Sequence, residues 1–304
     1  MNGAPRGLAV LADGCHAAFA AGAVAELARQ GRRWGVVLGA GLGAQVAALA
    51  GLGEADEAAR RWRRQGEQGC PLLAPLAEEA ERRLHGLEGA LPMLDPWRLP
   101  GWLNASHLAE HLAPEAGGVP ARLRQGGVRV LVLSLGVDRG QVGWDSLEAM
   151  ETGAAFDALV GACTFPGGWG PHRGADGARR WGGVGLLAAA PHEVLSLADA
   201  WDVVCGFPVP PVEREWLSPS LFEQLQRRDE VAAAEAVAGW VESVGERELT
   251  LLAPTASLWC RAEGRKDAEL GVEYPLPWER NGELVGRLLA LGAAAARQAG
   301  EAGP

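Results

Sequence analysis

Features of secreted, membrane and metal-binding proteins are scarce in this sequence. Its five cysteines are odd in number, lie far apart and form no C-x-x-C pair, so neither a disulfide framework nor a zinc site is indicated. No run of about 18 uncharged apolar residues occurs that could span a bilayer, and Asp13 and His16 interrupt the apolar segment near the first residue. We therefore expect no signal peptide, no integral membrane segment and a cytoplasmic location.

Basic residues are also fewer than acidic residues. The chain has 28 Lys and Arg residues against 38 Asp and Glu residues, which gives a net charge of -10. Because phosphate neutralisation needs a concentrated basic face, this balance argues against nucleic acid as a partner. Apolar residues make up 48% and charged residues 22%, which is ordinary for a globular protein. We expect one α/β domain over residues 1–304 and no cofactor.

A serine is missing where the local pattern is typical of a serine hydrolase. The apolar run 36–38 enters a glycine-dense turn, Gly39-Ala40-Gly41-Leu42-Gly43, and an alanine-rich helical segment leaves it. A strand, a tight turn and a helix form the Gly-x-Ser-x-Gly elbow, in which a strained backbone holds a hydroxyl above the end of the strand. The central residue here is Gly41, which has no side chain and cannot attack a carbonyl carbon. The sequence therefore indicates a hydrolase-like scaffold better than it indicates an activity.

Strand and helix patterns alternate along the chain. Strands are expected at 7–11, 36–38, 128–135, 202–207 and 248–253, and helices at 17–30, 54–65, 154–163 and 279–298. A helical region at 219–244 is expected to break near Arg228. Prolines punctuate residues 71–105, which we interpret as a lid or an irregular insertion. The alternation predicts a mainly parallel sheet covered by helices on both faces.

Taken in order, several motifs resemble those of the patatin-like phospholipases. The matching segments are 12–17 for the family's glycine loop, 39–44 for its Gly-x-Ser-x-Gly-Ala turn, 130–144 for a hairpin, 162–166 for an Ala-Ser-x-x-x-Pro passage, 181–183 for its Asp-Gly-Gly motif, and 249–254 and 288–292 near the end. The resemblance extends over nearly the whole chain. It implies a three-layer α/β/α patatin-like fold with a mainly parallel central sheet.

By this resemblance the chemistry is hydrolysis of lipid acyl esters by a serine–aspartate dyad, with glycine-loop amides holding the oxyanion. Carried over residue by residue, the nucleophile position is Gly41 and the base position is Trp181, so both chemical groups are absent. The pocket and oxyanion-loop positions are Asp13, Gly14, Cys15, His16, Gly39, Gly43, Gly182 and Gly183. Two loop glycines are replaced, and a carboxylate at Asp13 would oppose a developing oxyanion. The resemblance therefore implies a non-catalytic protein with the fold of a hydrolase.

Such a protein can still bind. The amides at the start of the helix after Gly41 could hold a carboxylate or phosphate, and Trp181 would place a large apolar surface where the base stood. We expect either a pocket for an acyl or lipid-like ligand or a pocket that is filled. A protein partner is equally compatible with the residues.

Three other interpretations stay open. Gly39-Ala40-Gly41-Leu42-Gly43-Ala44 also fits a dinucleotide fingerprint, although no acidic strand end follows about 20 residues later. His107 and His111 match the H-x-x-E-H pattern of zinc peptidases, on one helix face. An active lipid acyl hydrolase could use Cys15 as a substitute nucleophile, with His16 beside it.

Overall fold

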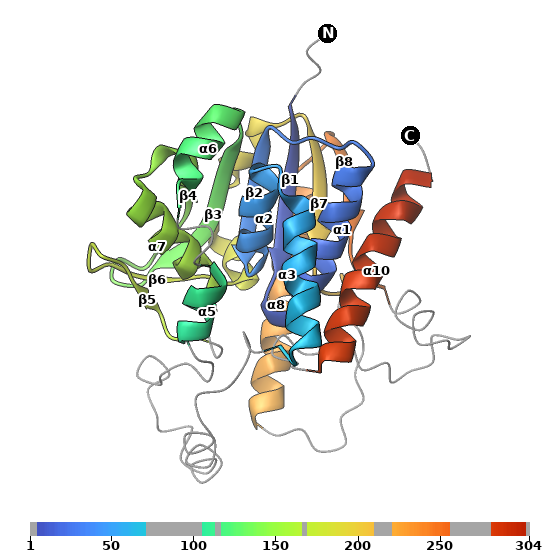
Figure 1. The fold of residues 1–304 in the computed structure, drawn as a ribbon. Coiled ribbons are helices and arrows are strands. Elements are labelled where there is room, and N and C mark those ends of the chain that lie inside the picture. The colour runs from blue at the N-terminus through green and yellow to red at the C-terminus, as the bar shows by residue number, and fades with distance from the viewer. Residues whose placement is uncertain are drawn as a thin grey trace.

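The computed structural model describes residues 5–70, 105–112, 117–165, 169–209, 221–255 and 281–301. At its centre lies a mixed sheet in the order β5-β6-β3-β2-β1-β7-β8, with β4 paired to β3 (Figure 1). The strands are β1 (Arg6–Ala12), β2 (Val36–Gly41), β3 (Arg129–Gly136), β4 (Gln141–Ser146), β5 (His172–Arg173), β6 (Arg179–Trp181), β7 (Ala200–Cys205) and β8 (Glu248–Leu252). The five strands β3, β2, β1, β7 and β8 run parallel, and β4, β5 and β6 form antiparallel pairs beside β3. The expected mainly parallel sheet is confirmed.

Helices cover this sheet on both faces. They are α1 (Ala17–Arg29), α2 (Gly43–Gly51), α3 (Ala55–Glu67), α5 (Ala105–Leu112), α6 (Val119–Gly126), α7 (Thr152–Cys163), α8 (Leu221–Glu242) and α10 (Gly282–Glu301). Figure 1 shows α1, α2, α3, α7 and α10 in front of the sheet and α8 behind it. On the rear side, Trp240 of α8 makes an edge contact with Trp201 of β7, their ring centroids 6.0 Å apart. The molecule therefore has the three layers of an α/β/α fold.

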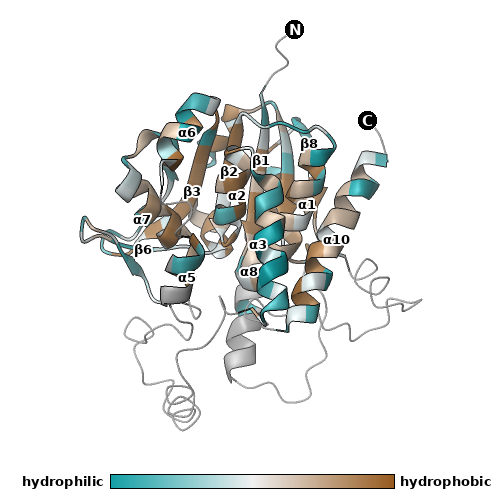
Figure 2. Ribbon diagram, viewed as in Figure 1, coloured by the Kyte–Doolittle hydropathy of each residue, from teal (hydrophilic) through white to brown (hydrophobic). Residues whose placement is uncertain are grey.

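The core is centred on β1 and β2, because these strands are enclosed on both faces. Residues 8–12 of β1 are fully buried, and the strands are the most apolar part of the molecule (Figure 2). A continuous apolar run is what a central parallel strand requires, since neither face meets water. These two strands thereby fix the position of the turn that follows β2.

Glycines allow the first and last described helices to pack closely. A Cβ atom on Gly22 of α1 would overlap the carbonyl oxygen of Leu289, and a Cβ on Gly292 of α10 would overlap that of Phe19. Backbones approach this closely only where side chains are absent. The two helices therefore interlock along the front layer.

A few expectations from the sequence are wrong or lie outside the described residues. Helix α8 runs without a break past Arg228, because a charged residue with an exposed side chain does not interrupt the hydrogen bonds of a helix. The short β5–β6 hairpin and α6 were not expected. The interpretation of 71–105 as a lid concerns residues 71–104, which are not described. Within the described ranges, none of the helices is long and apolar enough to cross a membrane.

Candidate functional site

Three segments that are distant in the sequence meet where β1 and β2 end. Ala12, the last residue of β1, is level with Gly41, the last residue of β2. The segment after β6 reaches the same place, because the backbone amide of Val184 donates a hydrogen bond to the Oδ2 atom of Asp13 at 3.1 Å. The loop, the glycine turn and the segment that begins at Trp181 thus come together at one place, which is the candidate site.

Gly41 has a backbone conformation that favours glycine. Its φ is +60°, a left-handed value at a sharp change from strand to helix. The neighbouring glycines allow close packing. A Cβ atom on Gly39 would lie 2.5 Å from the Cα of Ala44, and one on Gly43 would lie 2.5 Å from the carbonyl oxygen of Val10. The turn therefore has the shape of an elbow, without the side chain that an elbow presents.

The carboxylate of Asp13 occupies the space in which that side chain would begin. A Cβ atom on Gly41 would overlap Oδ1 of Asp13 and would lie 3.0 Å from its Cγ and 2.5 Å from the carbonyl oxygen of Ala12. Helix α2 begins at Gly43, and a helix N-terminus stabilises negative charge. An acidic group of the protein itself thus fills the place that the sequence offered to a ligand carboxylate or phosphate.

Trp181, the last residue of β6, lies on the side of the site formed by the β5–β6 hairpin. It pairs with Leu135 of β3, is 8% exposed, and donates its indole Nε1 hydrogen to the carbonyl oxygen of Trp169 at 3.1 Å. Gly182 follows with its amide bonded to Thr164 at 2.8 Å, and a Cβ there would overlap the carbonyl oxygen of Ala162. Gly183 has φ +113° and ψ 148°, which favours glycine and turns the chain toward Asp13.

The loop residues proposed as a substitute catalytic pair are enclosed. Gly14 has φ +51° and begins the 3-10 helix η1 (Gly14–His16). Cys15 is fully buried and His16 is 1% exposed, with its ring 6.3 Å from that of Phe207. A nucleophile must reach its substrate, so this setting favours a packing role for both side chains.

His111 takes part in a hydrogen-bond network within the protein. Its Nε2 lies 2.9 Å from Oε1 of Gln45 in α2, and its Nδ1 lies 3.2 Å from Nε2 of Gln65 in α3. Burial, with the charges of Arg61 and Arg64, lowers the pKa of His111 to about 4, so the ring is neutral near pH 7. The side chain of His107 is outside the described residues, among which no group of three or more metal-ligating side chains occurs.

The dinucleotide interpretation lacks its second strand. After the glycine turn the chain continues through α2 and α3, and residues 43–67 are almost entirely helical. The fingerprint requires a strand with an acidic end about 20 residues on. The carboxylate of Asp13 at the turn would also oppose a pyrophosphate.

Comparison with known proteins gives one structural likeness to report. Neither a protein-family model nor a curated protein matches the sequence. The crystal structure of VipD from Legionella pneumophila aligns with 98% of this chain and 67% of its own chain, at 13% sequence identity and a TM-score of 0.43. The site is therefore interpreted from its own residues.

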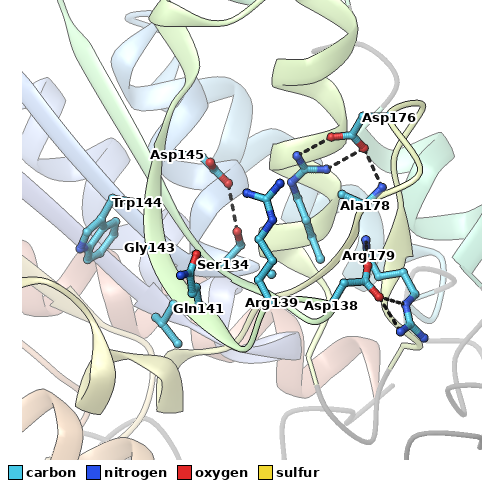
Figure 3. A pocket seen from close by; sticks show the side chains of 13 residues that line it. Ser134, Asp138, Arg139, Gln141, Gly143, Trp144, Asp145, Asp176, Ala178 and Arg179 are labelled. Atoms are coloured by element: carbon cyan, nitrogen blue, oxygen red, sulfur yellow. Dashed lines mark hydrogen bonds and ion pairs between the residues drawn. The ribbon is translucent and has the colours of Figure 1, made fainter.

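The structure also contains a polar cavity that the sequence analysis missed. It has a volume of about 340 Å³ and lies between the β3–β4 hairpin and the turn that joins β5 to β6. At its wall the hydroxyl of Ser134 donates to Oδ2 of Asp145 at 3.0 Å (Figure 3). The signal was a single polar residue, Ser134, in the apolar run of β3.

The contact between Gly41 and Asp13 can be measured by a double-mutant cycle. We expect Gly41→Ala to lower the free energy of unfolding by about 2–4 kcal/mol, because the energy of backbone strain at positive φ and the energy of overlap with the carboxylate add together. Asp13→Gly in that background should recover at least about 1 kcal/mol. Recovery is partial, since the carbonyl oxygen of Ala12 remains 2.5 Å from the new Cβ. Guanidinium denaturation provides the measurement.

Gly31→Ala is the matched control for that cycle. Gly31 has φ +88°, but nothing lies within 4 Å of an added Cβ, so this substitution reports backbone strain alone. Equal losses at Gly41 and Gly31, or additive effects in the cycle, would show that Asp13 does not fill the turn.

The neutral state of His111 predicts a pH dependence of stability. Its folded pKa of about 4 lies below the ordinary value of 6.5, so the unfolded chain binds the proton more readily. Stability should therefore fall by up to about 3 kcal/mol as pH drops from 7 to 4. In His111→Gln, urea denaturation should show a smaller fall over this range. His192→Gln, at an exposed histidine, is the control. An unchanged pH profile in His111→Gln would contradict the assignment.

Proposed function

We propose that this protein is a non-catalytic relative of the patatin-like lipid acyl hydrolases, which binds an acyl or lipid-like ligand or a protein partner without cleaving it. The carboxylate of Asp13 in the space beside Gly41 carries this proposal. The order of the sequence motifs and the parallel strand order β3-β2-β1-β7-β8 support it.

The arrangement opposes acyl transfer at each step. Gly41 offers no oxygen or sulfur to attack a carbonyl carbon, and Trp181 offers no basic group to accept a proton. An oxyanion formed beside the loop would face the negative charge of Asp13, whereas hydrolases place hydrogen-bond donors there. Replacing Gly41 alone would leave the other two obstacles in place.

The same carboxylate limits the kind of ligand. A fatty-acid or phosphate anion at the turn would share the site with Asp13, and like charges at close range repel. An uncharged acyl ester or an apolar protein segment avoids this repulsion. The proposed ligand therefore places neutral groups at the turn.

One observation favours an alternative, an active hydrolase with another nucleophile. The Ser134 hydroxyl is hydrogen-bonded to Asp145 beside a cavity, which is a nucleophile–base arrangement. However, Ser134 lies within β3, where it is level with Gly143 of the adjacent β4. The backbone amides of the strand donate hydrogen bonds to neighbouring strands, so they do not converge on one point as the donors of an oxyanion hole do. We therefore keep the non-catalytic function as the conclusion.

Active-site labelling separates the two functions. We expect no covalent labelling by a fluorophosphonate probe and no hydrolysis of p-nitrophenyl butyrate above that of heat-denatured protein, since no activated hydroxyl lies at Gly41. The Gly41→Ser, Trp181→Asp double variant should stay inert, because Asp13 remains. Ser134→Ala is the control for the alternative. Labelling of the wild type that maps to Ser134 and disappears in this variant would overturn the proposal.

Ligand charge gives a second test. We expect cis-parinaric acid methyl ester to bind about tenfold more tightly than the free acid at pH 7, as followed by probe fluorescence. Asp13→Asn should remove most of this preference, because the amide oxygen can still accept from Val184 while the charge is lost. Asp199→Asn, at an exposed position, is the control.

Equal affinity for acid and ester in the wild type would contradict the role given to Asp13. If neither probe binds, the acyl ligand is excluded and a protein partner remains. Labelling still decides the catalytic question, so the two parts of the proposal fail separately.

A further inference from the structure

The cavity beside β3 and β4 is separate from the glycine turn. None of the residues at its wall belongs to the loop 12–17, the turn 39–43 or the segment 181–184. Its volume of about 340 Å³ is that of a small-molecule site, and its wall carries three arginines and three aspartates. The cavity is therefore strongly polar but balanced in charge.

Two of the three arginines are already held by carboxylates. Arg179 donates to Oδ1 of Asp138 through Nη2 at 2.6 Å and through Nε at 2.9 Å. Arg180 donates to Asp176 at 2.9 Å. The pKa of Arg180 is raised chiefly by Asp176, and the charges of Asp145 and Asp157 add to this effect. Arg180 is thus hydrogen-bonded to Asp176, and the charges of Asp145 and Asp157 act on it without an ion pair of their own among the described residues.

Arg139 and Asp145 are the cation and the carboxylate of the cavity wall that have no ion pair among the described residues. Among the described residues, Arg139 makes no ion pair, and its guanidinium extends into the cavity between the Ser134–Asp145 pair and Asp176 (Figure 3). Asp145 accepts the Ser134 hydroxyl on Oδ2, while its Oδ1 accepts no hydrogen bond in the described part of the chain. The hydroxyl fixes the carboxylate in place without cancelling its charge.

We propose that this cavity binds a small zwitterion, with its ammonium group on Asp145 and its carboxylate or phosphate on Arg139. A plain anion would meet the charge of Asp145, and a plain cation would meet that of Arg139. A ligand that carries both charges satisfies both residues, and a planar guanidinium suits carboxylate and phosphate oxygens. The Ser134 hydroxyl aligns Asp145 for this contact.

Two sources provide this chemistry, namely free amino acids and the headgroup of a zwitterionic phospholipid. Their common feature is an ammonium group a few bonds away from an acidic group. L-alanine and L-glutamine represent the first source. O-phosphoethanolamine represents the second.

Isothermal titration of the full chain with these three compounds tests the proposal. We expect saturable one-to-one binding of at least one of them. Inorganic phosphate and ethylammonium chloride, which each carry one of the two charges, should bind at least about tenfold more weakly, because each satisfies one residue and leaves the other charge opposed.

Arg139→Gln and Asp145→Asn should each weaken binding by about tenfold to a hundredfold, the effect of losing one charge-assisted hydrogen bond. Both side chains line the cavity and take no part in the core, so thermal melts should stay close to that of the wild type. Arg122→Gln and Asp199→Asn, at exposed residues that are absent from the cavity wall, are the matched controls.

Three results would overturn the proposal: no saturable binding of any zwitterion, phosphate alone binding as tightly as the zwitterions, or binding unaffected by both cavity variants. If the amino acids and O-phosphoethanolamine bind with different affinities, the tighter binder identifies the source of the ligand. Tighter binding of the amino acids and tighter binding of O-phosphoethanolamine both support the proposal. The outcome is independent of fluorophosphonate labelling, which reports on the hydrolase chemistry alone.

Discussion

The contact between the Asp13 carboxylate and the backbone of Gly41 is the constraint on which the candidate site depends. The carboxylate lies where a side chain at the turn would begin, close to the start of α2, and it accepts the amide of Val184. It therefore joins the loop after β1, the turn after β2 and the segment after β6. One acidic side chain both closes the turn and links three segments that are far apart in the sequence.

Much of the fold could be read from the sequence because the central strands are continuous apolar runs. The strands β1, β2, β3 and β7 lie close to where these runs occur, and α1, α3, α7 and α10 lie close to the helical patterns. The edge strand β8 also lies close to an expected strand, but its side chains are mostly exposed or half-buried. Burial on both faces produces such a signal without help from tertiary contacts. The β5–β6 hairpin gives no comparable signal, since its strands are two and three residues long and form where β6 pairs with β3.

The site was only partly predictable for a related reason. The resemblance to the patatin-like motifs points to positions such as Gly41 and Trp181, but the direction of the Asp13 side chain depends on the fold around it. In the same way, H-x-x-E-H suggested a metal, whereas His111 is hydrogen-bonded to Gln45 and Gln65 from two other helices. Neither glutamine lies near His111 in the sequence, so no local pattern could reveal the network.

The interlocked glycines of α1 and α10 have a consequence for how the protein is made. Because Gly22 and Gly292 bring the two backbones together, the face of α1 that α10 covers is shielded only once residues 282–301 are in place. During synthesis this apolar face is exposed to solvent until the ribosome has released that segment. Docking of α10 is thus the step that completes the front layer of the molecule.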